Sequence, residues 1–302
     1  MVGLGEVLWD FLPSRKVLGG APTNFAYISA LLGNRGIVAS RVGDDPLGEE
    51  ACRVMEDLGL DTSYLQHDPK HQTGTASVSL DERGQPAFTI AQPAAWDFLE
   101  WTPEWNSLAT QADVICFGSL AWRSASSAQT IESFLQNTSA SAIRICDANL
   151  RDPFYTPTTL LNAFGYANIL KVNDQELTLV SPLFGGPSED EVSMATHLLR
   201  EFGLDLICVT KGAHGSLLVS PSQTVSHPGF PVAVSDAIGA GDAFTACVAH
   251  YHVQRRPLQE IGELANRFAS WIATQIGATP QISSADLKEL SSITREETTP
   301  RS

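Results

Sequence analysis

The chain has 302 residues, of which 43% are hydrophobic and 18% charged, which is enough to bury one large core or two modest ones. Its formal net charge is −15, and its isoelectric point is near 4.8. A surface this acidic repels phosphate backbones and anionic lipids, so the composition argues against nucleic-acid and membrane partners. An anionic small ligand would need local help from helix termini, a few placed cations and a divalent metal.

The five cysteines are scattered along the chain, with no Cys-x-x-Cys pair. Four of them lie in apolar runs and are expected to be small core residues of a protein from a reducing compartment. The N-terminus enters an apolar strand without a basic region or cleavage site. No stretch reaches the ~18 apolar residues of a membrane span. We therefore expect a soluble, cytoplasmic protein.

Short apolar runs alternate with amphipathic segments along the chain. The patterns predict strands over 2–9, 36–42, 114–117, 142–147, 169–172, 206–210 and 216–220. They predict helices over 23–32, 47–58, 125–136, 189–202, 241–252 and 258–275. This alternation is typical of an α/β fold in which helices cover both faces of a parallel sheet.

One segment departs from this alternation. Residues 75–80 and 87–90 alternate polar and apolar side chains on either side of the turn 81–84, which predicts a β-hairpin with one apolar face. A hairpin inserted between α/β units cannot easily join a parallel sheet. A lid, an edge appendage and a dimerisation surface are the open interpretations. Residues from about 291 onward are polar, and we expect them to be frayed.

Two N-terminal features predict contacts with a ligand. Asp10 follows the first apolar strand, where a lone carboxylate can reach the C-terminal edge of a parallel sheet; capping a turn is its alternative role. Gly19 and Gly20 permit close backbone approach, and Asn24 offers a donor and an acceptor to a polyol. The alternative for this second motif is a turn capped by Thr23 or Asn24.

The segment 147–151 closes another apolar strand. In an extended chain Asp147, Asn149 and Arg151 would share one face. An arginine there can bind phosphate oxygens with two nitrogens. An ordinary solvated strand end is the alternative.

Two further motifs follow later strands. Asn173 and Glu176 have the spacing of a capping box, and this role is compatible with holding Mg²⁺ through water. The segment 209–215 joins two apolar runs and contains Gly212 and Gly215. It either passes under a nucleotide or forms a hairpin loop.

The most informative stretch is 236–244, Asp-Ala-Ile-Gly-Ala-Gly-Asp-Ala-Phe. Its glycines precede an apolar run, the pattern of a tight turn that begins a buried helix, where unpaired N–H groups and the helix dipole favour an anion. Asp242 follows where a phosphoryl group held at that terminus would meet an attacking hydroxyl. A tight connection without a ligand is the alternative. The stretch does not match the dinucleotide-binding fingerprint, because Phe244 stands where that fingerprint has its third glycine. The chain also has no P-loop sequence.

Together these motifs resemble the ribokinase-like (PfkB) family of carbohydrate kinases. The segments that match the family's signatures, in chain order, are 19–24, 173–176, 210–215 and 236–242. The match extends from Gly5 to about Pro280. Finer details are similar to the bacterial fructokinase branch, in the segments 5–10, 40–45, 95–97, 117–121 and 277–280.

The resemblance implies a ribokinase-like three-layer α/β sandwich with a mostly parallel central sheet. It implies one domain over 1–302, with a discontinuous β-lid from about 10–19 and 70–97 and a frayed tail over 291–302. Such a lid would close over a sugar and exclude water. A monomer and a homodimer that pairs through the lid are both compatible with it.

The resemblance also implies transfer of the γ-phosphoryl group of Mg²⁺-ATP to a sugar hydroxyl, with fructose as the favoured acceptor. Ribose, 2-keto-3-deoxygluconate, inositol and nucleosides are alternative acceptors. A non-catalytic, sugar-responsive regulator is the alternative class, and the intact Asp242 and both glycines before it favour an enzyme.

The same resemblance implies roles for individual residues. Asp242 would be the general base, and the transferring phosphoryl group would meet Gly239, Ala240, Gly241 and Arg151. The sugar would contact Asp10, Gly19, Gly20, Asn24, Trp96 and Asp242. The nucleotide would contact Lys171, Asn173, Glu176, Thr210, Gly212, Gly215, Gly239, Gly241 and Asn266. Mg²⁺ would be held through water by Glu176 and Asn173, and a monovalent cation such as K⁺ by Asp236.

Overall fold

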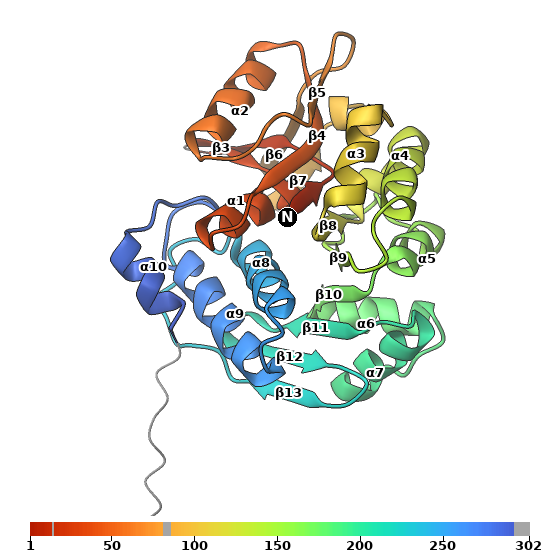
Figure 1. The fold of residues 1–302 in the computed structure, drawn as a ribbon, viewed down its shortest axis with the longest axis vertical. Helices are drawn as coiled ribbons and strands as arrows, with labels where there is room; N and C mark the ends of the chain where they lie inside the picture. The colour runs from red at the N-terminus through yellow and green to blue at the C-terminus, as the bar shows by residue number, and fades with distance from the viewer. Residues whose placement is uncertain (14, 81–85, 293–302) are drawn as a thin grey trace, which may run out of the picture.

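A computed structural model of the chain describes residues 1–13, 15–80 and 86–292 (Figure 1). Within them, the central sheet has nine strands in the order β13-β12-β11-β10-β9-β8-β1-β4-β5. Seven adjacent strands, β11 to β5 in this order, pair in parallel, and β12 pairs antiparallel with both β11 and β13. Their bounds are β1 Val2–Leu4, β4 Ile37–Gly43, β5 Leu65–Asp68, β8 Val114–Gly118, β9 Ile143–Asp147, β10 Ile169–Asn173, β11 Leu206–Thr210, β12 Ser216–Val219 and β13 Thr224–His227.

Helices cover both faces of this sheet, as the alternation predicted (Figure 1). One face carries α3 Pro103–Gln111, α4 Ala125–Gln136, α5 Pro157–Tyr166, α6 Asp174–Leu183 and α7 Glu191–Glu201. The other carries α1 Ala21–Leu31, α2 Pro46–Asp57, α8 Ala240–Val253, α9 Leu258–Ala273 and α10 Ser284–Leu290. Three short 3₁₀ helices are η1 Ala95–Phe98, η2 Leu120–Arg123 and η3 Gly212–His214. No helix in the described part of the chain has both the length and the apolar character needed to cross a membrane.

Each face of the sheet has its own apolar core. In β8, Ile115 and Phe117 belong to the core under α3–α7, and Val114 and Cys116 belong to the core under α1, α8 and α9. Successive side chains of a strand point to opposite faces, so a strand buried on both faces is a continuous apolar run. All five cysteines are free, and four are buried as predicted: Cys116, Cys146, Cys208 and Cys247.

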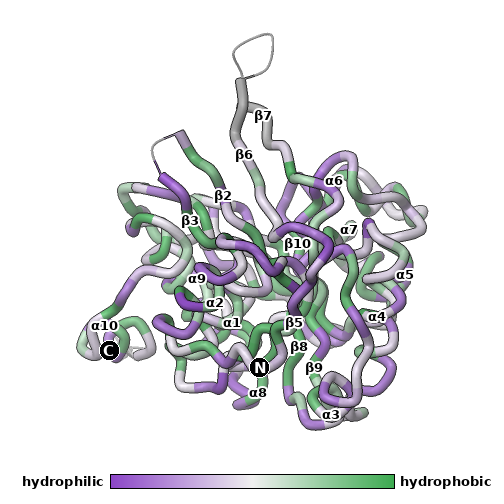
Figure 2. The backbone as a smooth tube through the Cα atoms, turned by 90° about the horizontal axis from the view of Figure 1, so that it is seen from above, coloured by the Kyte–Doolittle hydropathy of each residue, from purple (hydrophilic) through white to green (hydrophobic). Residues whose placement is uncertain are grey.

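A second sheet of four strands is separate from the central sheet, and its strands β2, β3, β6 and β7 lie at one side of the molecule (Figure 2). Its order is β3-β2-β6-β7, and its bounds are β2 Leu8–Leu12, β3 Arg15–Gly19, β6 Gly74–Leu80 and β7 Pro86–Ile90. The two strands of the predicted hairpin are therefore present, outside the central sheet. The predicted turn at 81–84 lies outside the described residues, as does the polar tail from 293 onward.

The prediction of one strand over 2–9 was wrong. Gly5 has a positive φ of 143°, and the chain leaves the central sheet there to enter β2 of the small sheet. The sequence concealed this break because the apolar run continues through it. Among the described residues, the sequence patterns did not predict β3, β5, β13, α3, α5, α6, α10 or the three 3₁₀ helices, although the family resemblance placed 10–19 in a β-lid.

The apolar core beneath α9 generates a prediction about stability. Phe268 is fully buried in it, so Phe268→Ala should lower the free energy of unfolding by about 3–5 kcal/mol, through lost burial and the cavity left behind. Leu179→Ala is the matched control, because that side chain on α6 is 55% exposed. Its effect should stay within about 0.5 kcal/mol. Urea unfolding followed by circular dichroism measures both, and equal losses would contradict the assignment of Phe268 to the core.

Candidate active site

The predicted site residues meet at the carboxyl edge of the central sheet. The strands β9, β10 and β11 end there at Asp147, Asn173 and Thr210. The helices α1 and α8 begin at the same edge, where Asn24 Nδ2 donates a hydrogen bond of 2.7 Å to Asp242 Oδ2. In open α/β sheets this edge is where ligands bind. The fold thus brings together the segments 19–24 and 236–242, which lie far apart in the sequence.

The turn before α8 has the geometry of an anion site. Gly239 is the N-cap, with φ of 81° in the left-handed region, and a Cβ there would lie 2.4 Å from the Cβ of Ala278. Glycine is therefore required for both conformation and space. The N–H of Ala240 donates to a carbonyl three residues earlier at 3.3 Å. Gly241 and Asp242 lie in the first turn, whose N–H groups have no helical partner and favour negative charge.

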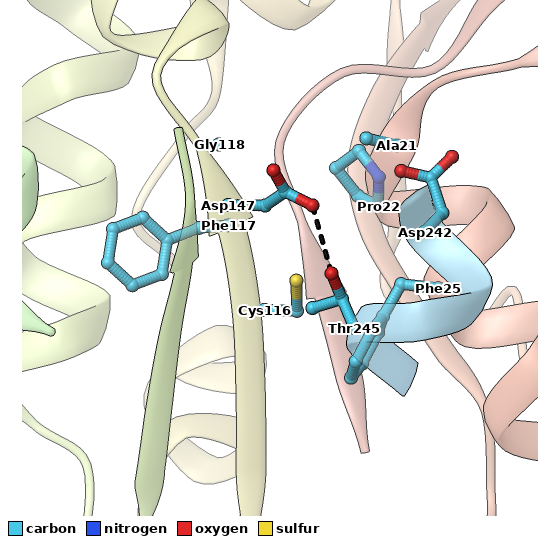
Figure 3. A pocket seen from close by; sticks show the side chains of 9 residues that line it. All are labelled: Ala21, Pro22, Phe25, Cys116, Phe117, Gly118, Asp147, Asp242 and Thr245. Atoms are coloured by element: carbon cyan, nitrogen blue, oxygen red, sulfur yellow. Dashed lines mark hydrogen bonds between the residues drawn. The ribbon is translucent and has the colours of Figure 1, made fainter. Parts of the chain in front are cut away.

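A buried carboxylate holds this helix to the sheet. Asp147 accepts a 2.9 Å hydrogen bond from Lys171 Nζ. It also accepts a 3.0 Å bond from Thr245 Oγ1 of α8, which Figure 3 shows. A Cβ on Gly241 would lie 3.1 Å from Lys171 Nζ, so the ammonium group is next to the anion site. Burial alone would lower the pKa of Lys171, but the negative charges of Asp147 and Glu176 outweigh it and raise that pKa. Lys171 therefore remains a cation.

Asp242 lies one turn before Thr245 on the same helix (Figure 3). Burial and, next, the negative charge of Asp147 raise its pKa to about 6, although the hydrogen bond from Asn24 and the charge of Lys171 act in the opposite direction. At neutral pH the carboxylate is therefore mostly ionised, and the pH is only slightly above its pKa. A group in that state can accept a proton.

Asp10, Gly19 and Gly20 lie on the small sheet or at its end. A Cβ on Gly19 would lie 2.2 Å from Asp10 Oδ2, so only glycine allows this carboxylate its position. Gly20 is the N-cap of α1. Burial raises the pKa of Asp10 to about 6, against the lowering effect of the positive charge of Arg151.

Glu6 is a candidate that sequence reasoning missed. It is 2% exposed, and its Oε2 has no hydrogen-bond partner among the described residues. Burial raises its pKa to about 7; the negative charge of Asp242 adds to this, and the charge of Arg151 opposes it. Its signal was a carboxylate directly after Gly5 within an apolar run. Arg151 itself is exposed, and its charge acts on all three carboxyl groups: Glu6, Asp10 and Asp242.

The capping box at the start of α6 is confirmed. Asn173 Oδ1 accepts from the N–H of Glu176 at 2.7 Å, and Glu176 Oε2 accepts from the N–H of Asn173 at 2.8 Å. The other oxygen of Glu176 accepts from the N–H of Leu150 at 2.8 Å. A carboxylate has about four acceptor positions, so each oxygen of Glu176 can still accept from a water.

The predicted nucleotide residues lie near the next strand. Thr210 ends β11 opposite Asn173, and Gly212 and Gly215 border the turn between β11 and β12. Asn266 is 4% exposed, and its Nδ2 donates to Ser216 Oγ and to a carbonyl of its own helix, each at 2.7 Å. Asn266 thus joins α9 to β12, and its contact with adenine stays a prediction.

One expectation about local geometry was wrong. The segment 147–151 is not extended, because the strand ends at Asp147 and Asn149 has a positive φ of 39°. Asp147 therefore faces Lys171 instead of sharing a face with Arg151. Trp96, expected to contact a sugar, is fully buried, with the Arg123 guanidinium 3.9 Å from its ring centroid. A sugar contact of Trp96 stays a prediction.

Asp236 precedes the anion site by three residues. Its carboxylate forms an ion pair with Arg15 of the small sheet. It also accepts hydrogen bonds from the N–H groups of Ile238 and Gly277, at 3.0 and 3.1 Å. The sequence analysis had not singled out Arg15.

Comparison with known proteins identifies relatives over nearly the whole chain. The family model described as pfkB family carbohydrate kinase matches residues 14–285. The fructokinase of Escherichia coli is 30% identical over 299 residues, which cover 91% of this chain and 93% of that protein.

Solved structures share the fold. The fructokinase of Vibrio cholerae O395 with fructose, ADP and a calcium ion has a TM-score of 0.80 at 25% identity, over 96% of this chain and 97% of that one. A double mutant of it is known with fructose, ADP and a potassium ion. The aminoimidazole riboside kinase of Salmonella enterica, with its riboside and an ATP analogue, has a TM-score of 0.80 at 23% identity, over 96% and 98% of the two chains. The ribokinase-like α/β fold predicted from the sequence is confirmed.

The buried pair of Lys171 and Asp147 generates a prediction about stability. Lys171→Met should lower the free energy of unfolding by about 3–5 kcal/mol, because it leaves Asp147 charged, buried and without a cation. The double variant Asp147→Asn/Lys171→Met should recover much of this loss. Lys16→Met is the control, because its pair with Glu50 is partly exposed and should contribute at most about 1 kcal/mol. Urea unfolding measures all three, and equal losses for Lys171→Met and Lys16→Met would refute the argument.

Proposed function

The chain belongs to the pfkB family of carbohydrate kinases and is an ATP-dependent sugar kinase, and from this premise we propose that its acceptor is fructose. The observation that supports fructose is the 30% identity to the Escherichia coli fructokinase over 91% of the chain. In the reaction the bond from the β–γ bridging oxygen to the γ-phosphorus breaks. A bond from the sugar oxygen to that phosphorus forms, ADP leaves, and the hydroxyl proton passes to a base.

Asp10, Gly19, Gly20 and Asn24 would bind the hydroxyl groups of the sugar. Asp10 lies directly against Gly19, Asn24 donates to the proposed base Asp242, and the charge of Arg151 acts on both Asp10 and Asp242. A carboxylate offers acceptors and an amide offers both donor and acceptor, as the recognition of a polyol requires.

Asp242 would take the proton of the attacking hydroxyl. Its pKa of about 6 lies close enough to neutral pH for a general base that must first be ionised and then accept a proton. Phosphoryl transfer has a loose transition state, so proton removal is needed only late. Burial and Asn24 hold the carboxylate in place.

The N-terminus of α8 would stabilise the transferring phosphoryl group. The N–H groups of Gly241 and Asp242 have no partner within the helix, and Gly239 and Ala240 form the turn beneath them. Lys171 Nζ is adjacent to Gly241 and adds a full positive charge. Fixed donors and charges of this kind lower the barrier because they need no reorganisation during the reaction. Arg151 would assist at the mouth of the site.

Mg²⁺ would accompany ATP, and the donor set fits it. Glu176 and Asn173 would hold it through water, as each oxygen of Glu176 keeps acceptor capacity beyond its backbone hydrogen bond. Mg²⁺ is usually bound by substrate phosphates, waters and one or two carboxylates, and not by a cage of protein ligands. When bound it neutralises charge on the β- and γ-phosphates. Thr210, Gly212, Gly215 and Asn266 would line the nucleotide.

The small sheet of β2, β3, β6 and β7 would act as the lid. It carries Asp10 on β2 and leads through Gly20 directly into α1. Closure of such a sheet over the sugar would exclude water and suppress ATP hydrolysis. A monomer and a dimer that pairs through this sheet both agree with that role.

A panel of acceptors tests the assignment of fructose. ADP release from Mg²⁺-ATP would be measured with fructose, ribose, 2-keto-3-deoxygluconate, inositol, adenosine and no acceptor. Fructose should give the highest kcat/KM. A clear preference for another acceptor would refute fructose and keep the kinase. If no acceptor releases ADP while ATP or a sugar still raises the melting temperature, an acceptor outside the panel or the regulatory alternative remains.

Asp242→Asn tests the general base. Without a proton acceptor kcat should fall about 10²–10⁴-fold, while the sugar still binds, because asparagine keeps the size of the side chain. Asp10→Asn is the matched comparison, and it should raise the sugar KM more than it lowers kcat. Steady-state kinetics with isothermal titration of the sugar separates the two effects. Turnover of Asp242→Asn near the wild-type rate would remove Asp242 as base.

The pH dependence tests the same residue independently. Since the base must be ionised and burial raises its pKa to about 6, kcat/KM should fall about tenfold per unit as the pH drops below about 6. Asp10 has a similar pKa, so the profile is measured in Asp10→Asn as well. The acid limb should persist in that variant. Its disappearance would assign the limb to Asp10 and sugar binding.

A further inference from the structure

An ion pair joins the small sheet to the turn that precedes α8. Arg15 is the first residue of β3, and Asp236 lies three residues before Gly239. Their pair connects residues 221 positions apart. This pair connects the strand hairpin that carries Asp10 to the loop that leads into the anion site.

The carboxylate of Asp236 organises two loops. Its Oδ1 accepts from the N–H of Ile238 at 3.0 Å, which shapes the turn into α8. Its Oδ2 accepts from the N–H of Gly277 at 3.1 Å, and the same oxygen accepts from Arg15 Nη2. Oδ2 thus has both of its acceptor positions filled, Oδ1 has one of two filled, and three chain segments meet at one carboxylate.

These contacts do not fit the monovalent cation expected at Asp236. A K⁺ could not use Oδ2, whose two acceptor positions are taken by Arg15 and Gly277, and at Oδ1 it would bind a carboxylate that the guanidinium already neutralises. The two positive charges would also lie within a few ångströms of each other and repel. A guanidinium is always charged and cannot dissociate from the chain.

We propose that Arg15 serves as a built-in cation at Asp236, so that phosphoryl transfer by this protein does not require K⁺. The guanidinium neutralises a carboxylate that would otherwise oppose a phosphate at the N-terminus of α8. It also keeps Asp236 in the position from which it binds Ile238 and Gly277. Arg15 is therefore a positioning residue that acts through Asp236.

The strand that supplies this cation links it to the sugar side of the site. Arg15 and Val17 lie two residues apart on β3 and so point to the same face; Val17 Cγ1 would lie 3.8 Å from a Cβ on Gly277. Across the hairpin, Val17 is the register partner of Asp10. The hairpin that offers Asp10 to the sugar thus also delivers the charge to Asp236.

The experiment compares wild type with Arg15→Met at constant ionic strength, with K⁺ replaced by tetramethylammonium. It uses the best acceptor of the panel, so it rests on the kinase activity and not on fructose. Wild-type kcat should change by less than about twofold. Without K⁺, the kcat of Arg15→Met should fall about tenfold or more, the effect of removing a charged hydrogen bond. About 100 mM K⁺, at which the Debye length is about 10 Å, should restore most of this loss.

Two variants make the result specific. Lys16→Met removes the neighbouring cation of β3, whose partner is Glu50, and should show no K⁺ dependence. Arg15→Met/Asp236→Asn removes both charges and should not depend on K⁺ either. The affinity for an ATP analogue, with and without K⁺, provides a readout that needs no sugar, and it should follow the same pattern.

Two outcomes would overturn the proposal. If wild type loses tenfold or more of its kcat without K⁺, a monovalent cation binds despite Arg15. If the loss in Arg15→Met is not recovered by K⁺ while the melting temperature equals that of wild type, Arg15 does not replace a cation. If Arg15→Met does not fold, Arg15→Gln is used, because glutamine also removes the charge; K⁺ stimulation of it above that of wild type supports the proposal, and equal stimulation opposes it.

Discussion

The buried carboxylate of Asp147 fixes the position of the reactive helix relative to the sheet. It accepts simultaneously from Lys171 on β10 and Thr245 on α8. Because a buried charge that loses a partner is costly, α8 cannot slide along β9 without a large loss of stability. The same bonds bring Lys171 next to Gly241 and place Asp242 one turn before Thr245. The geometry of the anion site thus depends on one interaction in the core.

An ATP-dependent kinase with a net charge of −15 has to bind a nucleoside triphosphate despite its acidic surface. At the proposed site the N-terminus of α8 and three cations, Lys171, Arg151 and Arg15, would supply positive potential locally. Burial makes the charged form of the carboxyl groups less stable. Burial raises the pKa values of Asp242, Asp10 and Glu6 into the range of about 6 to 7. Proton acceptance near neutral pH therefore follows from desolvation and not from a dedicated partner.

The fold leaves the acceptor open. A fructokinase and an aminoimidazole riboside kinase have the same TM-score of 0.80 with this chain, although their names record different acceptors. Under the proposed function, specificity would reside in the side chains around Asp10 and Asn24, since fold alone does not determine function. Gly19 contributes by the absence of a side chain, because the carboxylate of Asp10 occupies the space that a Cβ would need.

The sequence by itself determined the features that depend on neighbours in the chain. These are the alternation of strands and helices, the capping box of Asn173 and Glu176, and the glycine turn before α8, because periodicity, short-range hydrogen bonds and positive φ are local requirements. Only the tertiary structure decided which distant side chains meet. Asn24 and Asp242 are 218 positions apart, and an apolar run concealed the break at Gly5 that sends β2 into the small sheet. Burial and pairing across the sheet depend on how the layers pack, which no short segment specifies.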